Sequence, residues 1–190
     1  GIQALESSRT KIPLLLARPR PLVMGIVNIN DDSFSGDGSL DPEAALEQAI
    51  GQICEGADII DVGAESARTN RAAIPPEAEI ARLAPFLERL SAAIAQTAQA
   101  VPDPLCPPIL SVNTWRPVVA EAALEAGAQL LNDMGGLPTS ENAELCAHFG
   151  AALLIMHTPA PPTVARRGAT YPDLLETLRA FFTEKIALAE

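Results

Sequence analysis

The sequence predicts an α/β protein in which parallel β-strands alternate with α-helices in about five βα units. Short apolar runs alternate with longer amphipathic segments along the 190 residues, as such units require. The motif Gly-Ala, followed one residue later by two aliphatic residues, begins at Gly56, Gly127 and Gly150, and each copy is expected to end a helix and start a buried strand. Aromatic residues make up only 4% of the chain, so the core must be mainly Ala, Leu, Ile and Val. From the residues alone, the sheet is either doubly wound or the first part of a (β/α)8 barrel.

Residues 1–20 are predicted to form an N-terminal extension. Three prolines in and beside this segment rule out a long helix, and a short strand around Pro13–Leu16 is expected to lead as a hairpin into Leu22. The first core strand starts at Leu22 and breaks at Asn28, where a polar, glycine-rich loop follows. We expect the domain to cover residues 21–190.

The starts of the expected helices are marked by proline. Asp41 can cap a helix that has Pro42 at its first position. Pro75-Pro76 and Pro117 open two further helices. The first two helices carry apolar stripes at helical spacing, namely Leu46, Ala49, Ile50, Ile53 and Ala57, and Ile80, Leu83, Leu87, Leu90 and Ile94. The other expected elements are strands at Asp58–Gly63, Ile109–Thr114, Leu130–Met134 and Leu153–His157, a helix over Ser140–Phe149 and a final helix from Pro172.

Charge and composition exclude several classes of function. The net charge of -11 and the pI near 4.6 argue against nucleic-acid binding through a basic surface. The apolar run Ile12–Ala17 is too short to span a bilayer, so a membrane protein is not expected. Cys54, Cys106 and Cys146 are odd in number and form no Cys-x-x-Cys pattern, which is typical of small core residues in a reducing compartment. We therefore expect a cytoplasmic protein.

A polar residue lies at the carboxyl end of every expected strand, although the strands themselves are apolar. In a barrel these ends converge on one mouth, where the active sites of that fold lie. No Gly-x-Gly-x-x-Gly motif follows the first strand, so a dinucleotide-binding sheet is disfavoured. The strand-end residues are Asn28, Glu65 with Arg68, Asn113, Asn132 with Asp133, and His157.

Read in order, these residues fall into motifs that match a known family. The motifs are Met24-Gly-Ile-Val-Asn28 with Asp32-Ser-Phe-Ser35, Gly56-Ala-Asp-Ile-Ile-Asp-Val-Gly63 with Glu65-Ser66 and Arg68, Ser111-Val-Asn-Thr114, Asn132-Asp133, and Met156-His157. The chain resembles dihydropteroate synthase and the wider pterin-binding barrel family from about Pro21 to Tyr171. The resemblance implies a (β/α)8 TIM barrel that binds a pterin at its carboxyl mouth, with about five of its eight βα units in this chain.

The family resemblance also implies a reaction and roles for individual residues. The family condenses 6-hydroxymethyl-7,8-dihydropterin diphosphate with 4-aminobenzoate to give dihydropteroate and pyrophosphate in folate biosynthesis. The resemblance implies that Asn28 contacts the diphosphate and its Mg2+ ion, and that Arg68 lies near the anion and the second substrate. These two are the candidate catalytic residues. Candidate substrate-binding residues are Asn113 and Asn132 (hydrogen bonds to the pterin), Met134 and Met156 (packing against it) and position 67. A homodimer is a further expectation.

The sequence departs from the family pattern at several positions. Asn30 and Asp31 replace a threonine and a proline of the first loop, and Ala67 replaces a threonine whose hydroxyl can meet the diphosphate. Asn113 replaces an aspartate, which removes a negative charge that would stabilise a cationic pterin methylene. The family's site residues on strands six to eight are absent. We therefore expect the 190 residues of this chain to be part of a longer protein.

Purely structural roles for these residues, and functions other than the synthase, are the alternatives. Asn28 and Asn132 could simply cap turns, and Asp61 and Asp133 are expected to satisfy neighbouring groups inside the barrel. Neither histidine has a partner at metal-ligand spacing, so a zinc site is not expected. The alternatives to the synthase are a divergent, non-catalytic pterin-binding paralogue or scaffold, and a pterin-binding methyltransferase domain.

Overall fold

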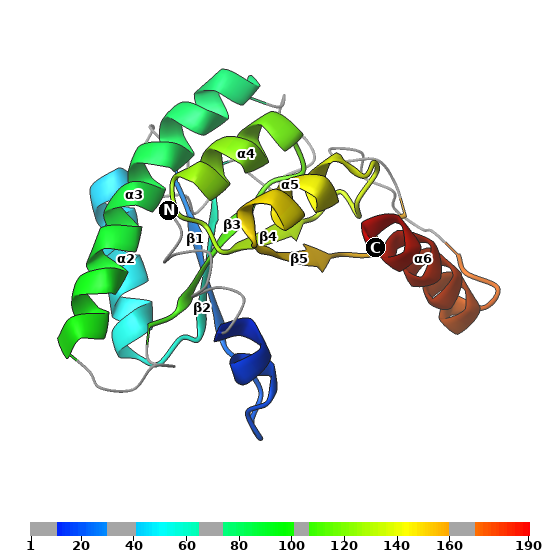
Figure 1. Cartoon of the computed structure of the whole chain (residues 1–190), viewed down its shortest axis with the longest axis horizontal. Coiled ribbons are helices and arrows are strands. Elements are labelled where there is room, and N and C mark those ends of the chain that lie inside the picture. Colours follow the sequence, from blue (N-terminus) through cyan, green and yellow to red (C-terminus); the bar gives the residue numbers. More distant parts are fainter. Residues whose placement is uncertain (1–10, 30–40, 65–73, 101–106, 160–169) are drawn as a thin grey trace.

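The computed structural model describes residues 11–29, 41–64, 74–100, 107–159 and 170–190. A five-stranded parallel sheet forms the centre of the fold, with the strands in the order in which they occur in the chain (Figure 1). The strands are β1 (Met24–Asn28), β2 (Ile59–Gly63), β3 (Ile109–Asn113), β4 (Leu130–Asp133) and β5 (Ala152–Ile155). The helices are α2 (Pro42–Cys54), α3 (Pro76–Ala100), α4 (Pro117–Glu125), α5 (Glu141–Phe149) and α6 (Leu174–Ala189).

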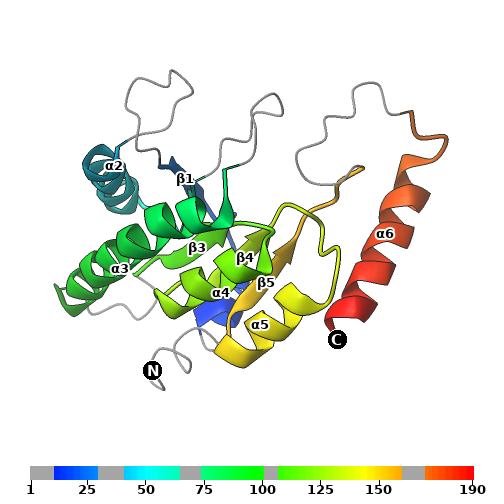
Figure 2. The same cartoon turned by 90° about the horizontal axis from the view of Figure 1, so that it is seen from above.

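Helices α2 to α5 cover one face of the sheet, and both views show them side by side on that face (Figures 1 and 2). Alternate strand residues point toward these helices. Val27, Ile60, Val62, Val112 and Leu131 are fully buried there. They pack in one cluster with the apolar stripe of α3, formed by Leu83, Leu87, Leu90 and Ile94. Sequential strand order with α2 to α5 all on one face is the arrangement of the first part of a (β/α)8 barrel.

Helix α6 is packed differently from the others. None of its residues is buried, and Figure 2 shows it standing apart from the layer of α2 to α5. Asp173 caps its first turn by accepting a hydrogen bond from the backbone N–H of Glu176 at 3.0 Å. No helix within the described ranges is long and apolar enough to cross a membrane.

The three Gly-Ala turns have the same backbone geometry. Gly56, Gly127 and Gly150 have φ values of 99°, 110° and 65°, in the left-handed region that favours glycine. At each turn the glycine N–H donates to the carbonyl three residues earlier, and the following alanine N–H donates to the carbonyl five residues earlier. This pair of bonds is the Schellman motif, which ends a helix and directs the chain into the next strand. The turns predicted from the repeated motif are confirmed.

The strand predicted around Pro13–Leu16 is wrong, because residues 11–16 form a short helix. The N–H of Ala17 donates to the carbonyl of Pro13 at 3.1 Å, and a proline is tolerated in a first helical turn, where its missing N–H has no partner to lose. Three consecutive leucines at positions 14–16 favour a helix over a strand. Leu15 packs against Ile109 and Leu130, the first residues of β3 and β4, so this helix closes the sheet at the amino ends of its strands.

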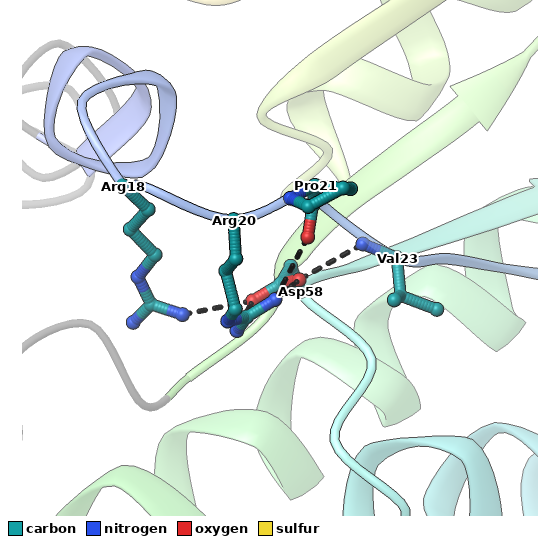
Figure 3. A network of polar contacts seen from close by, with 5 residues as sticks. All are labelled: Arg18, Arg20, Pro21, Val23 and Asp58. Carbon is teal, nitrogen blue, oxygen red and sulfur yellow. Dashed lines mark hydrogen bonds and ion pairs between the residues drawn. The ribbon is translucent and has the colours of Figure 1, made fainter.

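Asp58 ties the chain after this helix to the start of β2 (Figure 3). Its carboxylate accepts hydrogen bonds from Arg18 at 2.9 Å, from both terminal nitrogens of Arg20 at 2.7 and 2.8 Å, and from the backbone N–H of Val23 at 2.9 Å. The hydrogen bond from Arg20 is the main reason why the pKa of Asp58 lies below its usual value. The network lies at the end of the sheet opposite the carboxyl ends of the strands.

Every expected strand and helix from β1 to α6 is present, with small differences at the ends. Two predictions about single residues of α2 are wrong as well. Ile50 was expected in the apolar stripe of α2 and is 41% exposed, because Ala45 and Ala49 form the buried contact instead. Cys54 was expected in the core and is exposed at the end of α2. Cys146 is buried, as expected, and burial raises the pKa of its thiol to about 12. Cys106 lies outside the described residues.

Candidate functional site

The carboxyl ends of β1, β2 and β3 bring three site positions into contact. Asn28 pairs in register with Gly63, the last residue of β2. A Cβ atom on Gly63 would lie 3.2 Å from Oδ1 of Asn28 and 3.7 Å from Cβ of Asn113, so these two asparagines stand on either side of the glycine. Asn113 pairs in register with Asn132 on β4. The structure therefore places the predicted residues Asn28, Asn113 and Asn132 along one line across the sheet.

Asp61 forms the floor beneath these residues, on the face of the sheet opposite α2 to α5. It is 3% exposed and lies two residues before Gly63, on the same side of β2. Its carboxylate accepts hydrogen bonds from the Ser111 hydroxyl at 2.5 Å, Asn132 Nδ2 at 3.1 Å and Asn113 Nδ2 at 3.5 Å. The expectation that Asp61 satisfies neighbouring groups is confirmed.

Burial raises the pKa of Asp61, and the three hydrogen bonds from Ser111, Asn132 and Asn113 offset part of that rise. Donors favour the charged form of a carboxyl group, whereas removal from water disfavours it. Sequence reasoning did not place Asp61 among the site residues. The sequence feature that could have identified Asp61 is its position two residues before Gly63, because this position lies on the same strand face as the site.

Asn132 has a buried acceptor without a partner. The residue is 6% exposed, its Nδ2 is turned toward Asp61, and its Oδ1 has no hydrogen-bond partner among the described residues. A buried polar atom that is left unpaired costs about 1–3 kcal/mol, so native structures usually pair such atoms with protein, water or a ligand. The Oδ1 of Asn132 is therefore a candidate contact for a bound molecule.

Two methionines at the same end of the sheet are unusually open to solvent. Met134 follows β4 and is 39% exposed, and Met156 follows β5 and is 40% exposed. Asn113 Nδ2 lies 2.8 Å from the Met134 sulfur, which joins the apolar and polar parts of the mouth. Flexible, polarizable thioethers beside fixed hydrogen-bonding groups suit a flat, polar-edged ring.

Two other strand-end residues face away from this cluster. Asp133 accepts hydrogen bonds from the Gly135 N–H at 2.8 Å and from Asn142 Nδ2 on α5 at 3.0 Å. It therefore satisfies neighbouring groups, as expected, but it does so on the helical face of the sheet, and the prediction that it lies inside the barrel is wrong. His157 was expected at the mouth, but its ring packs edge-on against Phe181 of α6, with 4.9 Å between the ring centroids.

Arg68 and Ala67, two of the predicted site residues, lie outside the described residues, as do Glu65, Asn30 and Asp31. Ala64, at the start of that second loop, accepts a hydrogen bond from Arg82 Nη1 on α3 at 3.4 Å. No group of three His, Cys, Asp or Glu side chains that could hold a metal ion occurs in the part of the chain that the structure describes. Asn28, the predicted magnesium ligand, offers a single amide oxygen beside Gly63.

A family model described as pterin binding enzyme matches residues 24–190. The chain therefore belongs to the dihydropteroate synthase-like family of pterin-binding enzymes. The family resemblance predicted from the motifs is confirmed. So is the fold class, since the solved relatives described below share the fold and the five parallel strands are part of a (β/α) barrel.

Three curated relatives show how the similarity is distributed. A probable bifunctional folylpolyglutamate synthase/dihydropteroate synthase of Haloferax volcanii is 40% identical over 88% of this chain and 19% of its own length. Dihydropteroate synthase type-2 of Escherichia coli is 35% identical over 87% of this chain and 57% of its own. Inactive dihydropteroate synthase 2 of Mycobacterium tuberculosis is 40% identical over 75% of this chain and 42% of its own. The chain thus spans less than two thirds of the length of each of these relatives.

Two solved structures with bound ligands share the fold. The Xanthomonas albilineans dihydropteroate synthase with 4-aminobenzoic acid has a TM-score of 0.69 and 36% identity, over 90% of this chain and 56% of that one. The Anaplasma phagocytophilum dihydropteroate synthase with bound 6-hydroxymethylpterin-monophosphate has a TM-score of 0.72 and 26% identity, over 88% of this chain and 59% of that one.

Proposed function

We propose that this chain is part of a transferase that condenses 6-hydroxymethyl-7,8-dihydropterin diphosphate with 4-aminobenzoate, releasing pyrophosphate. The observation that carries the proposal is the buried cluster of Asp61, Ser111, Asn113 and Asn132, which ends in the unpartnered Oδ1 of Asn132. A pterin has a flat ring with hydrogen-bonding groups along its edge. Fixed polar atoms beside two exposed methionines offer both kinds of contact that such a ring needs.

The reaction needs a site that separates charge. The amine of 4-aminobenzoate attacks the methylene carbon of the pterin substrate, the C–O bond to the diphosphate breaks, and pyrophosphate leaves as an anion. The new secondary amine then loses its extra proton to water. Asn28, beside Gly63, is the described residue that we propose to face the diphosphate. We propose that Arg68, in the second loop, balances the charge of the leaving group, as a guanidinium can do for phosphate oxygens.

We propose that magnesium binds here as an ion shared with the substrate. Mg2+ prefers six oxygen ligands and commonly takes several of them from water and from substrate phosphates. The amide oxygen of Asn28 would supply one protein ligand, and the diphosphate would supply others. The bound ion would neutralise charge on the leaving group, while Asn113 and Asn132 hold the ring and Met134 and Met156 pack against it.

A non-catalytic pterin-binding paralogue is the second candidate, and particular residues favour it. Asn113 stands where the family pattern has an aspartate, and Ala67 stands where it has a threonine. The loss of one preorganised group can lower a rate on the order of 10²-fold. One relative at 40% identity is itself described as an inactive dihydropteroate synthase.

Pyrophosphate release by the full-length protein tests the proposal. The protein is incubated with Mg2+, 6-hydroxymethyl-7,8-dihydropterin diphosphate and 4-aminobenzoate, and released pyrophosphate is measured with a coupled assay. We expect release that depends on 4-aminobenzoate, which excludes simple hydrolysis of the diphosphate. Absence of turnover above background overturns the catalytic proposal. Calorimetric binding of the pterin without turnover then supports the paralogue.

Three further properties belong to this proposal. We propose that the protein acts in the cytoplasm, that residues 1–20 are an extension of a barrel domain that begins near residue 21, and that the protein is a homodimer. Light scattering of the full-length protein gives the mass that decides between monomer and dimer.

A further inference from the structure

Asp61 lies at the centre of the site but has no part in the bond-making steps of the proposed reaction. It is a buried carboxyl group that accepts hydrogen bonds from two other strands, from Ser111 and Asn113 on the neighbouring β3 and from Asn132 on β4, one strand further. It makes no ion pair with an arginine or lysine among the described residues. Hydrogen bonds from neutral groups therefore offset part of the free-energy cost of burying it.

An asparagine side chain has two different ends, a carbonyl oxygen that accepts and an NH2 group that donates. An ionised carboxylate only accepts, so an amide beside it must turn its NH2 group inward. Asn132 does so, with Nδ2 at 3.1 Å from the Asp61 carboxylate and its unpartnered Oδ1 directed elsewhere. Asn113 Nδ2 likewise lies between two acceptors, the Asp61 carboxylate at 3.5 Å and the Met134 sulfur at 2.8 Å.

We propose that Asp61 is a positioning residue that fixes the orientation of both site amides, so that the wall of the site presents the carbonyl oxygens of Asn113 and Asn132 to the ligand. Two carbonyl oxygens in this position favour a ligand whose ring edge carries N–H donors over a ligand whose ring edge carries acceptors. This inference rests on the proposed pterin site and adds a determinant of specificity within it.

A purely structural role for Asp61 predicts something different. Its hydrogen bonds connect β2 with β3 and β4, so its loss should lower the stability of the sheet in either case. A structural role alone, however, does not change which ring edge the site prefers. The ratio of affinities for two ligands that differ at one edge group therefore separates the two roles.

The experiment compares 6-hydroxymethylpterin with 6-hydroxymethyllumazine, in which an oxygen acceptor replaces the 2-amino donor. Calorimetry on the full-length wild-type protein is expected to give a preference for the pterin of about 10- to 100-fold, since each unpaired buried polar group costs about 1–3 kcal/mol. The Asp61→Asn variant allows either amide to turn around, and its preference should fall to about threefold or less. Asp58→Asn, at the opposite end of β2, removes a second buried carboxyl group as a control and should keep the wild-type ratio.

Each outcome of this experiment supports or overturns the positioning role of Asp61. Equal affinity of the wild type for both ligands, or a wild-type ratio in Asp61→Asn, overturns the positioning role and leaves the pterin site standing. If the wild type binds neither ligand, the proposed function itself fails and this inference fails with it. Should Asp61→Asn not fold, a crystal structure of the wild-type pterin complex takes its place. A ring N–H group opposite Asn132 supports the inference, and a ring acceptor atom opposite Asn132 overturns it.

Discussion

Asn132 Nδ2 on β4 donates to the Asp61 carboxylate on β2 at 3.1 Å, across the intervening strand β3. This bond joins residues 71 positions apart and sets the direction in which the Asn132 carbonyl points. The helices, the turns and the closed amino end of the sheet hold the strands in register, and the register brings these two side chains together. The contact links the fold to the proposed pterin site.

Asn132→Ala is expected to weaken binding of 6-hydroxymethylpterin by about 10- to 100-fold, because it removes a hydrogen-bonding oxygen from the wall of the site. The loss of unfolding free energy should be only about 1 kcal/mol, since the variant also removes an unpaired buried acceptor. Calorimetry and urea denaturation measure the two quantities.

Asn142→Ala is the matched control. Asn142 is also buried with an unpartnered Oδ1, but it donates to Asp133 and to the Trp115 carbonyl on the helical side of the sheet. It should lower stability and leave pterin affinity unchanged. Equal affinities for Asn132→Ala and Asn142→Ala would contradict the assignment of Asn132 to the site.

Asn113→Asp restores a carboxylate where the family pattern has one, close to Asp61. In a weak synthase it should raise the rate of pyrophosphate release by about tenfold or more, since a preorganised charge opposite a developing cation stabilises the transition state. The variant should also become less stable than the wild type as pH rises, because two neighbouring carboxyl groups must then both ionise. Rates and urea denaturation between pH 5 and 8 check both effects, and an unchanged rate would favour the non-catalytic paralogue.

Asp58→Asn should lower the unfolding free energy at neutral pH by about 2 kcal/mol, because charge-assisted hydrogen bonds to Arg18 and Arg20 are lost. The pKa of Asp58 is lowered in the folded protein, so its contribution is complete above the unfolded pKa of about 3.9 and is lost as pH falls through the folded value. The difference between the two proteins should therefore shrink in acid. A difference that stays constant with pH would show that the ion pairs contribute nothing.

Two glycines near the end of α2 should respond to alanine in opposite directions. Gly51 lies inside the helix and Gly56 has φ of 99°, and a Cβ on either would meet no atom within 4 Å. Gly51→Ala should stabilise the protein by about 0.5–1 kcal/mol. Gly56→Ala should destabilise it by about 1–2 kcal/mol, because alanine is strained in the left-handed region. Thermal denaturation gives both values, and the same sign for both changes would contradict the turn geometry.

Much of the fold could be predicted from the sequence because local signals agree with the final structure. The Gly-Ala turns, the prolines at helix starts and the apolar stripe of α3 each act over a few residues. The helix over residues 11–16 was missed because tertiary contacts stabilise it. Leu15 covers the amino ends of strands that lie far along the chain. Ile50 was misplaced because Ala45 and Ala49 make the buried contact of α2, with Leu46 and Ile53 packed beside them, and this leaves Ile50 exposed.

The candidate site was predicted in part. The positions of Asn28, Asn113 and Asn132 followed from strand ends, because parallel strands bring those ends to one edge. The role of Asp61 as a common acceptor could not be predicted, since it depends on the register of three strands and not on spacing along the chain. His157 was placed at the mouth from its position after β5, yet its ring contacts α6.

Binding of 6-hydroxymethylpterin to the full-length wild-type protein tests the shared basis of the synthase and of the non-catalytic paralogue. Isothermal titration calorimetry, with 6-hydroxymethylpterin titrated into the protein, measures it directly. A pterin site at the Asp61 cluster predicts saturable binding with one ligand per chain, which is lost or strongly weakened in Asn132→Ala. No heat of binding at millimolar ligand, or binding that is unchanged in Asn132→Ala, would contradict it.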